Sequence, residues 1–348
     1  MKRLALQVVA VLLVLAVAAA VLSLEARFSG FPGPIRLEIA PGTSTRELAS
    51  RLGAAGVIRY RWQFLLARAL RPRATLQAGE YRFEWAASTW EIFDRIARGD
   101  VVFYTMTIPE GSNLFEVASA VEATGLMSAA EFLGAARDPR PILDLAPEAP
   151  TLEGYLFPST YHLTRHTTAE QVCRQMTGKF RQVWAELKAA STPHHTVTLA
   201  SLVEKETARA DERPLVASVF ANRLRRQMRL QCDPSTIYAA LLENRYRGAI
   251  HRSDLESTNR YNTYLYAGLP PGPIANPGLA SLRAAAAPAE TGFLYFVARP
   301  GASGGHQFSS TLAEHQRAVA KYRRGTRKTI QKSAARRVPA KKPAGRRR

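Results

Sequence analysis

The sequence predicts an α+β protein that is tethered to a membrane by one N-terminal transmembrane helix. Three observations support this fold class. A run of about 21 mostly apolar residues lies at the N-terminus, short strand-like segments alternate with helical patterns, and one strand–turn–helix pattern occurs twice. With 348 residues, of which 46% are hydrophobic, the chain is long enough for two domains with their own cores.

The N-terminal apolar run covers residues 4–24 and has the length of a transmembrane helix. Lys2 and Arg3 precede it, so the positive-inside rule leaves residues 1–3 as a cytosolic stub and exports the remainder of the chain. A cleaved signal peptide is the alternative, because small residues occur at 18–20. We favour the uncleaved anchor because the run is long for the apolar region of a signal peptide.

Segments 38–50 and 107–119 resemble each other at an offset of 69 residues. Each predicts a short strand, a turn that contains glycine, and a helix that ends at another glycine. Thr43 and Ser112 are the candidate N-caps of the two helices. We therefore predict one α+β module with a duplicated strand–helix element over residues 34–137.

Four prolines between residues 138 and 150 predict a linker after this module. Residues 151–322 predict a second, mixed α+β domain that contains several helices and a buried strand at 293–297. The segment 268–278 holds four prolines and three glycines, so it is neither helix nor central strand. It either lines a cleft or serves as scaffolding.

The formal net charge of +20 is distributed unevenly. Residues 321–348 contain 13 Lys or Arg and no acidic residue, which leaves about +7 for the rest of the chain. We predict that 323–348 is a disordered basic tail. Because the predicted topology separates this tail from the genome, we expect no nucleic-acid partner. An anionic lipid surface, an acidic wall polymer or solvent are the alternatives for its surroundings.

The two cysteines, Cys173 and Cys232, either form one disulfide in an oxidising compartment or remain thiols. Neither lies in a CxxC pair or at metal-ligand spacing. His306 and His315 also lack a carboxylate or cysteine at ligand spacing, so we predict that both histidines are structural and that the chain has no metal site.

One face of a predicted helix combines apolar residues with a carboxyl group at positions i, i+3, i+4 and i+7: Leu199, Leu202, Val203 and Glu206. A carboxyl group in apolar surroundings resists ionisation, so it can stay protonated at neutral pH and donate a proton. Cleavage of a glycosidic bond requires such a general acid. Glu204 lies about 200° around the same helix, and the sequence predicts that it faces the surface.

Eight short motifs follow this pattern in a fixed order: VEKET at 203–207, ERP at 212–214, ASVFANRL at 217–224, LQCDP at 230–234, NTY at 262–264, GLPPGPIANPG at 268–278, LYFV at 294–297, and GH at 305–306 with EH at 314–315. In this order they resemble the MltG (YceG-like) family of endolytic murein transglycosylases. The segments EGYLFP at 153–158 and QAGEYRF at 77–83 are similar to that family as well.

The resemblance implies a single-pass enzyme of the cell inner membrane with most of its chain in the periplasm. It also implies a LysM-like module at 34–137 and a YceG-like catalytic domain at 151–322. Such enzymes cleave nascent peptidoglycan strands internally, between N-acetylmuramic acid and N-acetylglucosamine, and leave a 1,6-anhydro-muramic acid end. By its place in the motif, the catalytic glutamate falls on Glu206. No cofactor is implied, and peptidoglycan synthases are candidate partners.

Four further residues are candidates for substrate binding: Asn222, Asp233, Asn262 and Tyr264. The two amides and the tyrosine would bind N-acetyl groups or stack on sugar rings. The alternative is that they satisfy buried backbone groups. Asp233 either orients the carboxyl group of Glu206 or caps the following helix.

Three positions depart from the usual pattern of the family. Cys232 occurs where Ser or Thr is usual, Ser159 where Asp is common, and Gln316 where Asn is usual. Two other functions remain as alternatives. One is a non-catalytic, membrane-tethered scaffold that binds peptidoglycan. The other is a hydrolytic muramidase, which would need a second carboxylate to activate water.

Overall fold

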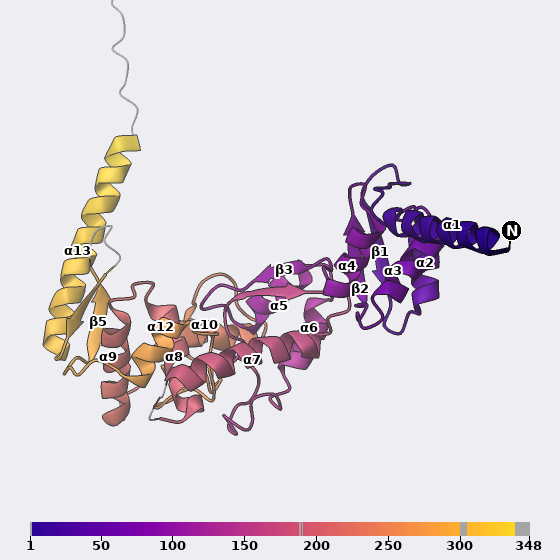
Figure 1. The fold of residues 1–348 in the computed structure, drawn as a ribbon. Coiled ribbons are helices and arrows are strands. Elements are labelled where there is room, and N and C mark those ends of the chain that lie inside the picture. Colours follow the sequence, from indigo (N-terminus) through magenta and orange to yellow (C-terminus); the bar gives the residue numbers. More distant parts are fainter. Residues whose placement is uncertain (1, 188, 190, 300–304, 338–348) are drawn as a thin grey trace, which may run out of the picture. The chain divides into compact units, whose positions relative to one another are not determined.

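The computed structural model describes residues 2–187, 189, 191–299 and 305–337. Its helices and short strands confirm a mixed α+β protein (Figure 1). The chain divides into two compact units. The first comprises the residues up to Met106 together with Tyr161–Thr167, and the second comprises Thr107–Thr160 and the chain from Thr168 onward.

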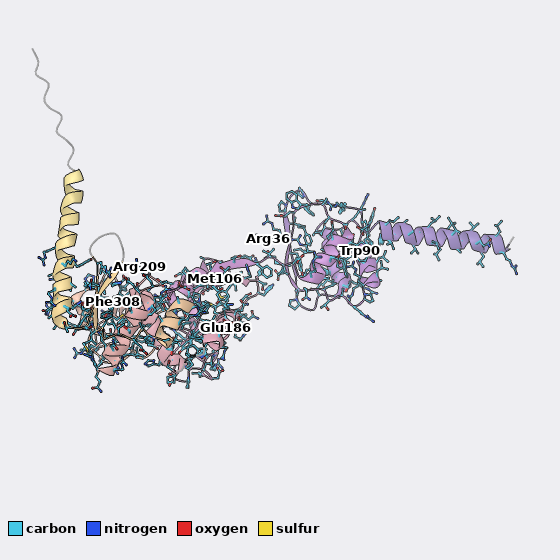
Figure 2. The ribbon with its side chains drawn as sticks, turned by 60° about the vertical axis from the view of Figure 1, so that its left-hand side comes forward. Arg36, Trp90, Met106, Glu186, Arg209 and Phe308 are labelled. Carbon is cyan, nitrogen blue, oxygen red and sulfur yellow. The ribbon has the colours of Figure 1, made fainter. Side chains whose placement is uncertain are left out.

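Helix α1 (Lys2–Leu22) corresponds to the predicted N-terminal anchor. Its span Arg3–Leu22 is long and apolar enough to cross a membrane, and the side chains of this span are not buried against protein (Figure 2). The helix ends directly before Ser23, and Leu24 is fully buried in the core of the first unit. The chain therefore passes from α1 into this unit without a linker.

The core of the first unit lies between a pair of antiparallel strands and three helices. The strands β1 (Ile35–Ile39) and β2 (Gly79–Phe83) pair with Leu37 opposite Tyr81. The helices are α2 (Thr45–Ala54), α3 (Arg61–Leu70) and α4 (Thr89–Arg98). They bury large apolar side chains against the strands, among them Leu48, Leu52, Phe64 and Phe93, and Tyr81 of β2 is buried in the same core. That this unit is LysM-like stays a prediction.

Both copies of the predicted repeat form a strand, a turn and a helix. The first copy consists of β1 and α2, and the second of β3 (Tyr104–Thr107) and α5 (Leu114–Glu122). Gly42 and Gly111 occupy the turns with φ angles of 81° and 78°, a left-handed conformation that glycine adopts without strain. The N-caps are Ser44 and Asn113, each one residue after the predicted position.

The boundary between the two units differs from the predicted one. It falls at Met106, inside the predicted module, and α5 belongs to the second unit. The reason is that the N-terminus of α5 is bonded within the second unit, where the backbone N–H of Leu114 donates to the carboxylate of Glu153 (2.8 Å). The segment 138–150 is also packed in the second unit, because Ile142, Ala146 and Ala149 are buried there.

The second unit is built mainly from helices. Among the described residues it contains α5, α6 (Ala129–Ala136), α7 (Ala169–Leu187), α8 (Pro193–Glu206), α9 (Arg213–Arg225), α10 (Asp233–Leu242), α11 (Arg252–Leu255), α12 (Leu279–Ala286) and α13 (Leu312–Arg337). Its strands β5 (Tyr295–Ala298) and β6 (His306–Ser309) pair antiparallel. Strand β4 (Thr160–Leu163) pairs with β3, and the unit boundary falls within both of these strands.

The predicted disordered tail begins in a helix. Helix α13 continues to Arg337, whereas disorder is predicted from residue 323; residues 338–348 lie outside the described residues. The difference has a local cause, because Lys, Arg, Gln and Ala dominate the sequence up to Arg337 and all have high helix propensity. The first proline of the tail occurs only at position 339.

Candidate active site

Helix α8 carries the candidate general acid at its last residue. Pro193 occupies the first turn, where its fixed φ angle suits a helix start, and Glu206 ends the helix. The predicted apolar face is confirmed, since Leu199, Leu202 and Val203 are buried. The whole stretch 196–203 is buried, however, so α8 lies inside the unit and has no solvent-facing side over these residues.

The carboxyl group of Glu206 lies in surroundings that favour its protonated form. Burial raises its pKa above the ordinary value, and the negative charge of Asp233 acts in the same direction. The thiol of Cys232 donates a hydrogen bond to this carboxyl group, and the charges of His306 and Arg223 also oppose the rise. The net effect is a raised pKa, which is the property expected of a general acid that works near neutral pH.

The prediction that Glu204 faces the surface is wrong. Its side chain is only 6% exposed, and Arg213 donates a hydrogen bond to it at 2.8 Å. The backbone N–H of Gly278 donates to its other oxygen at 3.0 Å. Because α8 is surrounded by protein, the face opposite Glu206 is also covered, and Glu204 links α8 to the N-terminus of α9 and to the loop 268–278.

Asp233 and Tyr264 form one pair beside Glu206. The hydroxyl of Tyr264 donates a hydrogen bond to Asp233 Oδ1, and burial raises the pKa of this hydroxyl. Asp233 is the first residue of α10 and directly follows the N-cap residue, Cys232. Asp233 is therefore not the N-cap of α10, and its role at the carboxyl group of Glu206 stays a prediction.

Asn222 and Asn262 bind backbone groups of the protein. Asn222 Nδ2 donates to the carbonyl oxygens of Thr291 and Phe293, both at 2.8 Å. Asn262 Nδ2 donates to Leu255 O (2.9 Å) and to Ser257 O (2.8 Å). Both amide groups use their two N–H donors in this way, which corresponds to the structural alternative weighed from the sequence.

Two residues near Glu206 received no role from sequence reasoning. Arg223 is buried, donates to Leu294 O (2.7 Å) and Leu230 O (2.8 Å), and lies 5.3 Å from the centre of the Tyr295 ring. Its charge acts on Glu206 from α9. The second residue, Cys232, appeared only as a departure from the family pattern. A charged residue inside the mostly apolar run 217–224 was the signal that could have indicated Arg223.

The histidines make structural contacts. His306 Nδ1 lies 2.7 Å from Glu212 Oε2, and its backbone N–H donates to Glu212 Oε1 at 2.9 Å. Burial alone would raise the pKa of Glu212, but these bonds from His306 hold it below its ordinary value. His315 stacks on the ring of Tyr295 at 5.1 Å. Within the described residues, no group of three or more His, Cys, Asp or Glu could hold a metal ion. Cys173 and Cys232 are both free thiols.

A second buried carboxyl group holds the loop 268–278 in place. Glu153 is buried, which raises its pKa to about 8. It accepts a hydrogen bond from Asn276 Nδ2 (3.1 Å), and Asn276 Oδ1 in turn accepts from the N–H of Leu156 (2.9 Å). On the same loop, the N–H of Ile274 donates to Ser201 Oγ of α8 at 3.0 Å. The loop is therefore bonded directly to the helix that carries Glu206.

A groove of about 420 Å³ adjoins this part of the second unit. Its wall includes Lys205 and Pro234, the direct sequence neighbours of Glu206 and Asp233. Aromatic rings on the wall include that of Tyr246. A groove with exposed rings suits stacking of sugar rings, because both surfaces are partly apolar and flat.

Comparison with known proteins identifies related chains. The chain is 32% identical over 309 residues to the endolytic murein transglycosylase of Bacillus subtilis (strain 168), a match that spans 83% of this chain and 84% of that protein. It is 29% identical over 321 residues to the endolytic murein transglycosylase of Streptococcus pneumoniae serotype 2 (strain D39 / NCTC 7466), which spans 58% of that protein.

A crystal structure at 2.6 Å of a yceG-like protein from Listeria monocytogenes is also similar, with a TM-score of 0.53 and 33% sequence identity. The match covers 82% of this chain and 98% of that one. The model of the YceG-like family matches residues 37–321, which include the whole motif series with Glu206. The chain therefore belongs to the YceG-like family.

Proposed function

We propose that this protein is an endolytic lytic transglycosylase that cleaves glycan strands of peptidoglycan with Glu206 as its general acid and base. The observation that carries the proposal is the carboxyl group of Glu206, whose pKa is raised by burial. The names of the Bacillus and Streptococcus relatives support the substrate class. We further propose the bond between N-acetylmuramic acid and N-acetylglucosamine in nascent strands as the site of cleavage.

In the proposed reaction, protonated Glu206 donates its proton to the oxygen that links the two sugars, and the bond from C1 to this oxygen breaks. The carboxylate of Glu206 then accepts the proton of the C6 hydroxyl of the muramic acid, whose oxygen forms a bond to C1. The products are a free hydroxyl on one fragment and a 1,6-anhydro end on the other. No water enters, so no second carboxylate is needed to activate one.

The neighbours of Glu206 support this cycle. The negative charge of Asp233 favours the protonated form that begins the reaction, and the thiol of Cys232 stabilises the carboxylate that exists between the two proton transfers. We also propose that the groove beside Lys205 and Pro234 receives sugar rings of the strand. Asn222 and Asn262 would then act by holding the backbone around the site, since their amide donors are occupied.

We propose that α1 anchors the enzyme in the inner membrane with the N-terminus in the cytosol, because Lys2 and Arg3 precede the apolar helix. The two units would then lie in the periplasm, where the substrate is. We propose the first unit as the LysM-like module and the second as the catalytic domain. The part of the basic tail that the structure describes is a helix, and an anionic surface remains its proposed partner.

The test is digestion of purified murein with the full-length protein in detergent, followed by mass spectrometry of the new chain ends. The proposal predicts that cleavage at internal bonds of long strands creates new ends that carry 1,6-anhydro-muramic acid. Reducing ends would instead indicate the hydrolytic muramidase. Binding of murein without any new ends would indicate the non-catalytic scaffold.

A further inference from the structure

Helix α3 of the first unit exposes an apolar surface on the side that faces away from the core. It buries Gln63, Phe64 and Ala67. On its opposite face Trp62 and Leu65 are 45% and 36% exposed, and Tyr60, the residue before the helix, is 49% exposed. A helix that is apolar on two faces has a second surface to cover, since a strictly solvent-exposed face is normally polar.

The charge next to this surface is strongly positive. Residues 59–73 contain five arginines and no acidic residue. The guanidinium group of Arg59 lies 5.5 Å from the centre of the Tyr60 ring, and the rings of Tyr60 and Trp62 stack at 6.3 Å. We call Arg59, Tyr60, Arg61, Trp62 and Leu65 the α3 surface. In the described part of the chain, Arg59 and Arg61 form no ion pair with a carboxylate, so both charges remain open to an anionic partner.

The start of helix α3, which carries this surface, is bonded to the end of α1. Gln63 Nε2 donates a hydrogen bond to the carbonyl oxygen of Ser23 at 3.0 Å, and Ser23 directly follows α1. Leu24 is fully buried in the same core as Phe64 of α3. The first turn of α3 is therefore attached to the point where the chain leaves α1, and the attachment contains no flexible linker.

We propose that the α3 surface docks onto the headgroup region of the bilayer that α1 spans. The inference rests on the anchor role of α1 proposed above. Trp and Tyr side chains concentrate at membrane interfaces because one part of each ring is apolar and another is polar. Arg59 and Arg61 bind lipid phosphates, because a guanidinium group matches the geometry of a phosphate. Docking holds the first unit in one orientation on the membrane, where α1 alone would allow it to rotate.

The experiment uses the full-length protein in vesicles that contain phosphatidylglycerol. Trp62→Cys and Leu65→Cys are each labelled with an environment-sensitive dye; both native cysteines are buried and take up little label. Arg36→Cys is the control, since Figure 2 shows Arg36 on the side of the first unit away from α1. At positions 62 and 65 the dye emission shifts to the blue and is quenched by spin-labelled lipids, whereas at position 36 it does neither.

Flotation of the vesicles separates the two proposals. If the protein does not float with the lipid, the anchor role of α1 and the docking both fail. If it floats and the dye at 62 and 65 behaves as at 36, the docking alone is refuted. The double charge reversal Arg59→Glu with Arg61→Glu gives a second measurement. It should reduce quenching at position 65 in anionic vesicles and change it little in neutral ones; quenching in anionic vesicles that stays at the level of the parent would refute the role of the arginines.

Discussion

Replacing Glu206 by Gln removes the proton that the proposed mechanism uses twice and preserves the shape of the side chain. A positioned general acid contributes about 10²- to 10⁴-fold to rate, which corresponds to about 2.7–5.4 kcal/mol at 1.36 kcal/mol per factor of ten. Because the same carboxyl group also accepts the C6 hydroxyl proton, we expect Glu206→Gln to lose activity at the upper end of this range. The amide oxygen of Gln can still accept the hydrogen bond of Cys232, so the fold should remain.

The stability of this variant is a second, independent readout. The Glu206 carboxyl ionises near pH 4.5 in the unfolded chain and at a higher pH in the folded protein. Between these two values the folded state binds more protons than the unfolded state, so the free energy of unfolding falls as the pH rises, by about 1.36 kcal/mol per pH unit. Gln carries no such proton. Glu206→Gln should therefore match the parent in stability near pH 4 and exceed it at neutral pH.

Two assays measure these effects on full-length protein in detergent. Mass spectrometry of murein digests reports anhydro ends, and denaturant unfolding at several pH values reports stability. Glu186→Gln is the matched control, because Glu186 is an exposed carboxylate on α7 of the same unit (Figure 2). If folded Glu206→Gln still releases anhydro ends at the rate of the control, the assignment of Glu206 is refuted. An unchanged pH dependence of stability would refute the raised pKa.

Three further substitutions probe the surroundings of this group. Glu204→Gln breaks a buried ion pair with Arg213, so it should lower the free energy of unfolding by about 3–5 kcal/mol and reduce cleavage less than Glu206→Gln; a folded, fully inactive variant would reverse the two roles. Cys232→Ser places a stronger donor on the Glu206 carboxylate, which lowers its pKa, so the loss of kcat/KM at high pH should begin at lower pH. Asp233→Asn removes a negative charge and should shift the same limb in the same direction; an upward shift in either pH profile would contradict the argument.

Local patterns predicted several features of this protein correctly. The apolar side of α8 and the partial burial of Glu206 followed from helical periodicity, and both copies of the strand–turn–helix element followed from a glycine pattern. The prediction for Glu204 was wrong because periodicity describes angles around one helix. It does not report how many sides of that helix other segments cover. The linker predicted from prolines at 138–150 is packed in the second unit for the same reason, since Ile142 and Ala146 are buried by segments distant in sequence.

By itself, the sequence determined the apolar helix at the N-terminus, the α+β class and a glutamate poised on the apolar side of a helix, because each depends on residues within a few turns of one another. Only the tertiary structure decided which groups surround that glutamate. Burial by these segments raises the pKa of Glu206, and Cys232, His306 and Arg223, from three different parts of the chain, moderate the rise through a hydrogen bond and through their charges. The structure likewise brought Gln63 to Ser23, forty residues away, which attaches the start of α3 to the end of α1.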